Sequence, residues 1–151
     1  MKNIFPLILF NFMVLTISNA QEITPSKKQT RDIHSLIDNY SVARQKKDTL
    51  LLGRILTTNI DQLVSSGKWR KGKEESMKGM LQSSENNPGT RTLKIENIRL
   101  LNPQCGIVDT RYEIQNTNGT TRKMWSTFMV IFKNSEWKIT AIRNMLPAGQ
   151  K

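Results

Sequence analysis

The stretch that decides the fold covers residues 90–145 and reads TRTLKIENIRLLNPQCGIVDTRYEIQNTNGTTRKMWSTFMVIFKNSEWKITAIRNM. Apolar and polar residues alternate with a period of two along four segments of it, which favours β-strands. These segments are residues 90–101, 106–115, 121–133 and 137–145. The connections between them are short enough for antiparallel hairpins. Asn118-Gly119 predicts a type I′ turn, because both central residues of that turn need a positive φ.

The residues before this stretch have the periodicity of helices. Five residues between Thr30 and Lys47 fall at helical spacing and form one stripe: Ile33, Leu36, Ile37, Tyr40 and Arg44. Asp48 has the side chain and the position to cap a second, short helix. Residues 59–65 alternate like a short strand, and a third helix follows Gly72. We therefore expect an α+β domain with about three N-terminal helices packed on a curved, mainly antiparallel sheet.

The segment 121–133 is apolar on both of its faces, because Trp125, Met129 and Ile131 alternate with Phe128, Val130 and Phe132. A strand of this kind is covered on both sides. The predicted helices can cover only one face of the sheet. We therefore expect a second copy of the chain on the other face, in a homodimer.

The first twenty residues have the anatomy of a signal peptide. Lys2 is followed by an apolar run and then by Ser18-Asn19-Ala20, with small residues at the cleavage site. The apolar run is shorter than the roughly 20 residues that cross a bilayer, so we expect no transmembrane segment. The predicted organisation is a signal peptide (1–20), a flexible linker (21–29), one domain (30–147) and a tail (148–151). We expect an exported protein, periplasmic or extracellular after cleavage near Ala20.

The chain is strongly basic, with a formal net charge of +11. The signal segment contains one basic residue and no acidic residue, so the net charge after cleavage is +10. Because we expect export, we expect no nucleic acid partner. A basic surface of this kind can serve solubility alone, and the alternatives are binding of anionic lipid headgroups, of acidic glycans or of a small anionic or amphipathic ligand. Cys105 is the only cysteine, so core packing rather than disulfides must hold the fold, and the role of Cys105 stays open.

Two sequence strings, together with the order of the elements, resemble a known superfamily. The strings are GKWRKGKEE at residues 67–75 and WKITAIRNMLP at residues 137–147. Over residues 30–147 the chain resembles the nuclear transport factor 2-like superfamily, and the second string is similar to its uncharacterised SnoaL-like branch. The resemblance implies a cone-shaped roll with a ligand cavity between the helices and the concave sheet face. Many members of that branch have a histidine where this chain has Arg143, so a histidine-based step is not carried over.

The resemblance and the strand periodicity together select the candidate ligand-binding residues. Alternation places Arg143 on the same face as Trp137 and Ile139, which the resemblance implies is the cavity face. There Arg143 could clamp an anion. Alternatively, it could form an ion pair with Asp109 or Glu113 on a neighbouring strand, or lie exposed at the cavity mouth. Tyr40, Trp69 and Trp125 are the expected neighbours of such a ligand.

The favoured function is that of an exported, non-catalytic domain that binds a small ligand, with an unknown physiological role. One alternative is a cofactor-independent isomerase-like or dehydratase-like enzyme with Asp61 or Tyr40 as acid or base. Another is a dimeric interaction module whose pocket is filled by its own side chains. We expect no metal and no cofactor, because one histidine and one cysteine do not supply the usual ligands.

Overall fold

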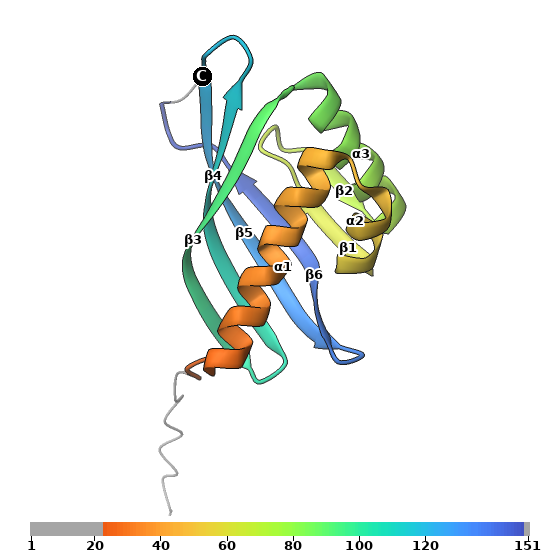
Figure 1. Cartoon of the computed structure of the whole chain (residues 1–151), viewed down its shortest axis with the longest axis vertical. Coiled ribbons are helices and arrows are strands. Elements are labelled where there is room, and N and C mark those ends of the chain that lie inside the picture. Colours follow the sequence, from red (N-terminus) through yellow and green to blue (C-terminus); the bar gives the residue numbers. More distant parts are fainter. Residues whose placement is uncertain (1–22, 150–151) are drawn as a thin grey trace, which may run out of the picture.

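The computed structural model describes residues 23–149, which form three helices and one six-stranded sheet (Figure 1). In chain order the elements are α1 (Lys27–Lys46), α2 (Thr49–Ile55), β1 (Leu56–Leu63), β2 (Trp69–Lys71), α3 (Lys73–Asn86), β3 (Gly89–Asn102), β4 (Cys105–Asn116), β5 (Thr121–Lys133) and β6 (Glu136–Met145). The expected helices and strands are all present, and β2 is an addition that the periodicity does not predict. The expected signal peptide lies outside the described residues.

Helix α1 begins three residues earlier than the periodicity predicts. The Ser26 hydroxyl accepts a hydrogen bond from the backbone N–H of Gln29, and the Gln29 side chain accepts one from the Ser26 N–H. This capping box starts the helix inside the segment 21–29, so the prediction that the whole segment is a flexible linker is wrong. At the next boundary Asp48 caps α2, as predicted, by accepting a hydrogen bond from the Leu51 N–H at 2.9 Å.

The sheet has the strand order β2-β1-β6-β5-β4-β3. Strands β1 and β6 are parallel, and the other neighbouring pairs are antiparallel. The C-terminal hairpins therefore form a meander from β3 to β6, and the N-terminal strand β1 adds to its β6 edge. This is the mainly antiparallel sheet that the alternation predicts.

The type I′ turn occurs in a different hairpin from the predicted one. Asn134 and Ser135, which join β5 to β6, both have positive φ, at 53° and 63°. In the β4–β5 connection only Gly119 has a positive φ, at 83°, and its N–H bonds to the carbonyl of Asn116 at 3.0 Å. The prediction of a type I′ turn at Asn118-Gly119 is therefore wrong. The connection is a three-residue loop with glycine in the left-handed position.

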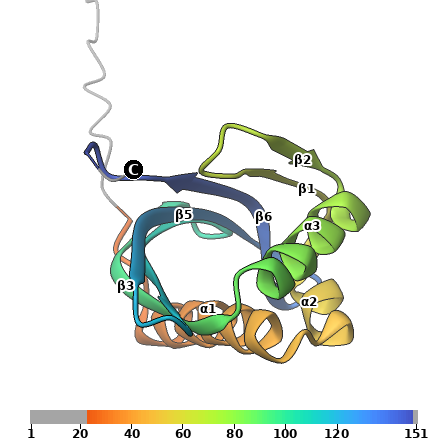
Figure 2. The same ribbon diagram turned by 90° about the horizontal axis from the view of Figure 1, so that it is seen from above.

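The hydrophobic core lies between the helices and one face of the sheet, which we call the inner face (Figure 2). The stripe of α1 packs there, with Ile33 and Ile37 fully buried. The ring of Tyr40 meets the ring of Phe128 edge-on, with centroids 5.2 Å apart. Burying one large apolar side chain contributes about 1.5–3 kcal/mol, so this helix-on-sheet contact stabilises the fold.

Along β6 the side chains change face after Ile139. Ile139 pairs with Val130 but Ala141 pairs with Met129, so one residue of β6 has no partner and forms a β-bulge. Beyond the bulge the even-numbered residues face the core. Arg143 consequently lies on the opposite, outer face. The prediction that this strand alternates without interruption, with Arg143 on the cavity face, is wrong for this reason.

Candidate functional site

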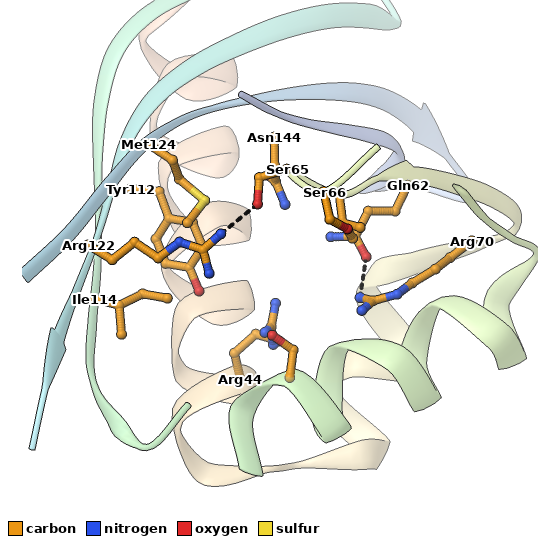
Figure 3. A pocket seen from close by; sticks show the side chains of 12 residues that line it. Arg44, Gln62, Ser65, Ser66, Arg70, Tyr112, Ile114, Arg122, Met124 and Asn144 are labelled. Atoms are coloured by element: carbon orange, nitrogen blue, oxygen red, sulfur yellow. Dashed lines mark hydrogen bonds between the residues drawn. The ribbon is translucent and has the colours of Figure 1, made fainter. Parts of the chain in front are cut away.

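One end of the core opens into a cavity of about 180 Å³, which we call the arginine pocket (Figure 3). Helices α1 and α3 and all strands except β3 contribute to its wall or to its rim. The lining residues are Arg44, Gln62, Val64, Ser65, Ser66, Arg70, Ser83, Tyr112, Ile114, Arg122, Met124 and Asn144. These twelve residues, all within the described part of the chain, include three arginines and no aspartate or glutamate.

Arg44 forms the floor of the arginine pocket. It lies on the apolar stripe of α1 and is only 5% exposed. Its guanidinium donates one hydrogen bond to the hydroxyl of Tyr40 at 2.8 Å and another to the hydroxyl of Ser84 at 3.1 Å. Both partners are neutral acceptors, and an arginine side chain has five N–H donors. The positive charge of Arg44 is therefore solvated by hydroxyl groups and not neutralised by a carboxylate.

Arg70 enters from the short strand β2. Its guanidinium donates to the Gln62 side-chain oxygen at 2.9 Å, and Gln62 is itself 1% exposed on β1. The side chain crosses α3 at Gly79, where a Cβ atom would overlap it. Burial lowers the pKa of Arg70, the nearby charge of Arg44 lowers it further, and Glu75 acts in the opposite direction. The guanidinium stays protonated, so two like charges share one end of the core.

Arg122 comes from the start of β5, on the side of the pocket opposite Arg70 (Figure 3). It donates a hydrogen bond to the hydroxyl of Ser65 at 2.8 Å. Ser65 follows β1 in the connection to β2, so this bond links two segments that are far apart in the sequence. Arg122 is half-buried, and its partner is again a neutral hydroxyl.

An apolar wall lies on the same side of the pocket as Arg122 (Figure 3). Tyr112 and Ile114 on β4 and Met124 on β5 are 4–6% exposed and pack as a small cluster with Leu93. All three point inward because they alternate with outward residues along their strands. The pocket thus combines positive charge, neutral hydrogen-bonding groups and an apolar surface.

Tyr40 lies one hydrogen bond away from the pocket without lining it. It is 3% exposed, and its hydroxyl accepts the bond from Arg44. Burial raises the pKa of Tyr40, and the charge of Arg44 only partly opposes this effect. The phenol is therefore neutral at physiological pH, and its observed role is to position Arg44.

The other predicted site residues gather on the outer face. Arg143 forms an ion pair with Asp61, with 2.6 Å between Nη1 and Oδ1, and its guanidinium carbon lies 4.7 Å from the centre of the Trp69 ring. Trp125 is on the same face, and the guanidinium carbon of Arg111 lies 5.2 Å from the centre of its ring. Of the alternatives considered for Arg143, an ion pair is the one observed, but with Asp61 rather than Asp109 or Glu113. The structure brings Asp61, Trp69 and Arg143 together, on the opposite side of the sheet from the pocket.

The sequence pattern does not single out the three arginines of the pocket as site residues, although two of them carry a signal. Arg44 falls at the end of the apolar stripe of α1, where a cation is unusual. Arg122 has the same parity along its strand as Met124 and Phe128, which places it on the inner face. Arg70 had no such signal, because β2 has only three residues and depends on pairing with β1.

Two further properties concern metal ions and membranes. Within residues 23–149 the structure brings together no group of three or more His, Cys, Asp or Glu side chains that could hold a metal ion. In the same range no helix has the length and apolar character needed to span a membrane.

Sequence comparisons found no matching family model and no matching curated protein. Structural comparison gives clear matches. A nuclear transport factor 2-like protein of unknown function from Shewanella oneidensis MR-1 is 22% identical, with 77% of this chain and 98% of that chain covered and a TM-score of 0.65. A domain of unknown function with a cystatin-like fold from Nostoc punctiforme PCC 73102 is 15% identical, with 82% and 80% covered and a TM-score of 0.72.

A third similar structure is a nuclear transport factor 2-like protein of unknown function from Pseudomonas putida KT2440. It is 12% identical, with 82% of this chain and 90% of that chain covered and a TM-score of 0.69. At these identities the likeness concerns the backbone architecture and not the site. The chain therefore has the nuclear transport factor 2-like, or cystatin-like, α+β fold that its sequence resemblance implies.

Proposed function

We propose that this protein is an exported domain that binds a small anionic ligand in the arginine pocket without turning it over. The observation that carries the proposal is the set of three guanidinium groups at one cavity with no carboxylate among the lining residues. Elsewhere among the described residues arginines are held by a carboxylate, as Arg143 is by Asp61, or by backbone carbonyls, as the buried Arg91 is, whereas the hydrogen bonds of the pocket guanidinium groups go to neutral side chains. In the pocket an external anion takes the place of that acid.

The electrostatics of the pocket favour such a ligand. Removing a charge from water is costly unless the charge is paired, and Arg44 and Arg70 also repel each other. A bound anion relieves both the desolvation and the repulsion. Hydrogen bonds to charged groups contribute about 1.5–3 kcal/mol each, so even two of them give measurable affinity for a small molecule.

The binding proposal is preferred over catalysis because of where the acid and base candidates lie. Asp61 is on the outer face and is held by Arg143. Tyr40 is buried behind Arg44, and its pKa is raised by burial, which makes it a poor proton donor at neutral pH. Neither residue lines the arginine pocket, so an isomerase-like or dehydratase-like step there has no assigned acid or base.

We also propose that the outer face pairs with a second copy of the chain. It carries exposed apolar side chains, with Trp69, Trp125 and Met145 at 45%, 39% and 52% exposed. Three of its acidic residues pair with basic ones, Asp61 with Arg143, Glu96 with Lys94 and Arg111, and Glu113 with Lys123, while Asp109 accepts a hydrogen bond from Thr127. Exposed apolar side chains among paired charges allow two copies to approach with less repulsion than the strongly basic composition of the chain alone would give.

The binding proposal is tested by calorimetric titration of the mature chain with small carboxylates and with inorganic phosphate at low salt. Saturable binding is expected for at least one anion, and chromatography of the mixture should recover that anion unchanged. Arg122→Gln should weaken the binding at least tenfold. Arg99→Gln is the matched control, because Arg99 is an exposed arginine of β3 that does not line the pocket. Equal binding by both variants, or no binding of any anion, would refute the proposal.

A further inference from the structure

The positions of the three charges in the arginine pocket restrict the kind of anion that fits. Figure 3 shows Arg122 and Arg70 entering from opposite sides, with Arg44 between them at the floor. Arg122 and Arg70 are each held on their own side of the pocket by a neutral partner, Ser65 for Arg122 and Gln62 for Arg70. Charges held apart in this way favour a ligand with two separated anionic groups over a single compact anion.

The total positive charge of the arginine pocket also favours a ligand with two negative charges. Three guanidinium groups line the pocket, and each is protonated at any physiological pH. A ligand with one negative charge would leave two positive charges at the end of the core without a counterion. A dianion reduces this excess to one, and Arg44, which already has two hydroxyl partners, is the best solvated of the three.

The size and surface of the pocket indicate which kind of carbon skeleton can join the two anionic groups of the ligand. The cavity has a volume of about 180 Å³. An apolar cavity of roughly 150 Å³ holds one benzene molecule, and sites for drug-sized molecules begin at roughly 300 Å³. The room is therefore that of one ring or a short chain. The wall of Tyr112, Ile114 and Met124 offers that skeleton an apolar contact.

We propose that the ligand is a compact dicarboxylate, with one carboxylate held by Arg122 and the other by Arg70 over Arg44. Carboxylates match the planar, two-pronged donor geometry of guanidinium groups. The short carbon skeleton lies against the apolar wall of Tyr112, Ile114 and Met124. This inference rests on the proposed anion-binding function and names the ligand class for that same pocket.

The test compares each dicarboxylate with its own monomethyl ester, which keeps the skeleton and removes one charge. The mature chain is titrated calorimetrically at low salt with succinate, glutarate and phthalate, with their monomethyl esters, and with inorganic phosphate. At least one dicarboxylate should bind ten times more tightly than its ester and more tightly than phosphate. Arg122→Gln should abolish this preference, and Arg99→Gln should preserve it.

The other possible results separate the dicarboxylate inference from the proposed anion binding. Equal affinity for the diacids and their esters would overturn the dicarboxylate inference and leave the proposed anion binding in place. Phosphate as the tightest ligand would do the same, because it indicates one compact anion. No binding by any of these anions would overturn both. If Arg122→Gln unfolds, Arg122→Lys keeps the charge but loses the two-pronged geometry, and the preference for the diacid should then fall without the loss of the fold.

Discussion

The side chain of Arg70 crosses helix α3 at Gly79, where a Cβ atom would overlap the Nε, Cζ and Cδ atoms of the arginine. Nε and Cζ belong to the guanidinium group itself, and Cδ is the carbon that carries it. A larger residue at position 79 would therefore displace the guanidinium from its observed position. Gly79 consequently determines whether Arg70 reaches Gln62 and the pocket.

Gly79→Ala should weaken binding while the protein stays folded. Alanine is a better helix former than glycine by about 1 kcal/mol, but the buried Gln62 oxygen loses its donor at a cost of about 1–3 kcal/mol, so the free energy of unfolding should stay the same or fall by up to about 2 kcal/mol. The displaced Arg70 can no longer donate to a bound anion, and the affinity should fall about tenfold, which corresponds to about 1.4 kcal/mol. Thermal unfolding and calorimetric titration of the same sample measure the two effects.

The control for this substitution is Gly53→Ala in helix α2. A Cβ atom at Gly53 would meet only the end of the Met77 side chain, at 3.6 Å, which is ordinary contact. This variant should gain about 1 kcal/mol of stability, because no hydrogen bond is displaced, and keep the wild-type affinity. A Gly79→Ala protein that binds as tightly as wild type would show that Arg70 does not contribute to the site.

Tyr40 should give the stability of the fold a dependence on alkaline pH. Burial raises the pKa of its phenol above the ordinary value of 10.0, although Arg44 opposes the shift. Above pH 10 the unfolded chain releases this proton more readily than the folded chain does. The stabilisation present below pH 10 is therefore lost as the pH rises toward the folded-state pKa. Urea unfolding at a series of pH values should show the decrease.

Tyr40→Phe isolates this contribution, because it keeps the edge-on ring contact with Phe128 and removes the titrating group. The alkaline decrease in the free energy of unfolding should be smaller in the variant. At neutral pH the variant should be less stable by about 1–3 kcal/mol, since one buried donor of Arg44 loses its acceptor. Identical pH profiles for the two proteins would contradict the role assigned to Tyr40.

The sequence predicts the layers of this fold better than its site. The alternation of β3 to β6 and the stripe of α1 identify the sheet and the helix that pack together, because burial imposes those periods. The bulge in β6 is not visible in the same way. Ala141 and Ile142 are both apolar, so the alternation of apolar and polar residues does not show which of the two faces the core. The site depends on which side chains converge at one end of the core, and Arg70 arrives there through a strand that exists only by pairing with β1.

Arg143→Gln should leave anion binding unchanged, because the bulge places Arg143 on the outer face. The substitution removes an ion pair whose side chains are 29% and 39% exposed, and exposed pairs contribute about 1 kcal/mol or less. The dissociation constant for the tightest anion should stay within about twofold of wild type. A tenfold loss of affinity in the same calorimetric titration would show that Arg143 contributes to anion binding and would count against the arginine pocket as the site.

The outer face should control association between copies of the chain. Trp125 and Met145 are paired across β5 and β6 on this face and are 39% and 52% exposed. Trp125→Lys adds a positive charge beside Arg111 at the centre of the proposed contact, and burial of an unpaired charge is strongly unfavourable. Sedimentation analysis should find a dimer for wild type and a monomer for Trp125→Lys. Leu50→Lys on α2 introduces the same charge at a site that is 86% exposed, so this control should remain a dimer. A wild-type monomer at high concentration would refute the proposed pairing.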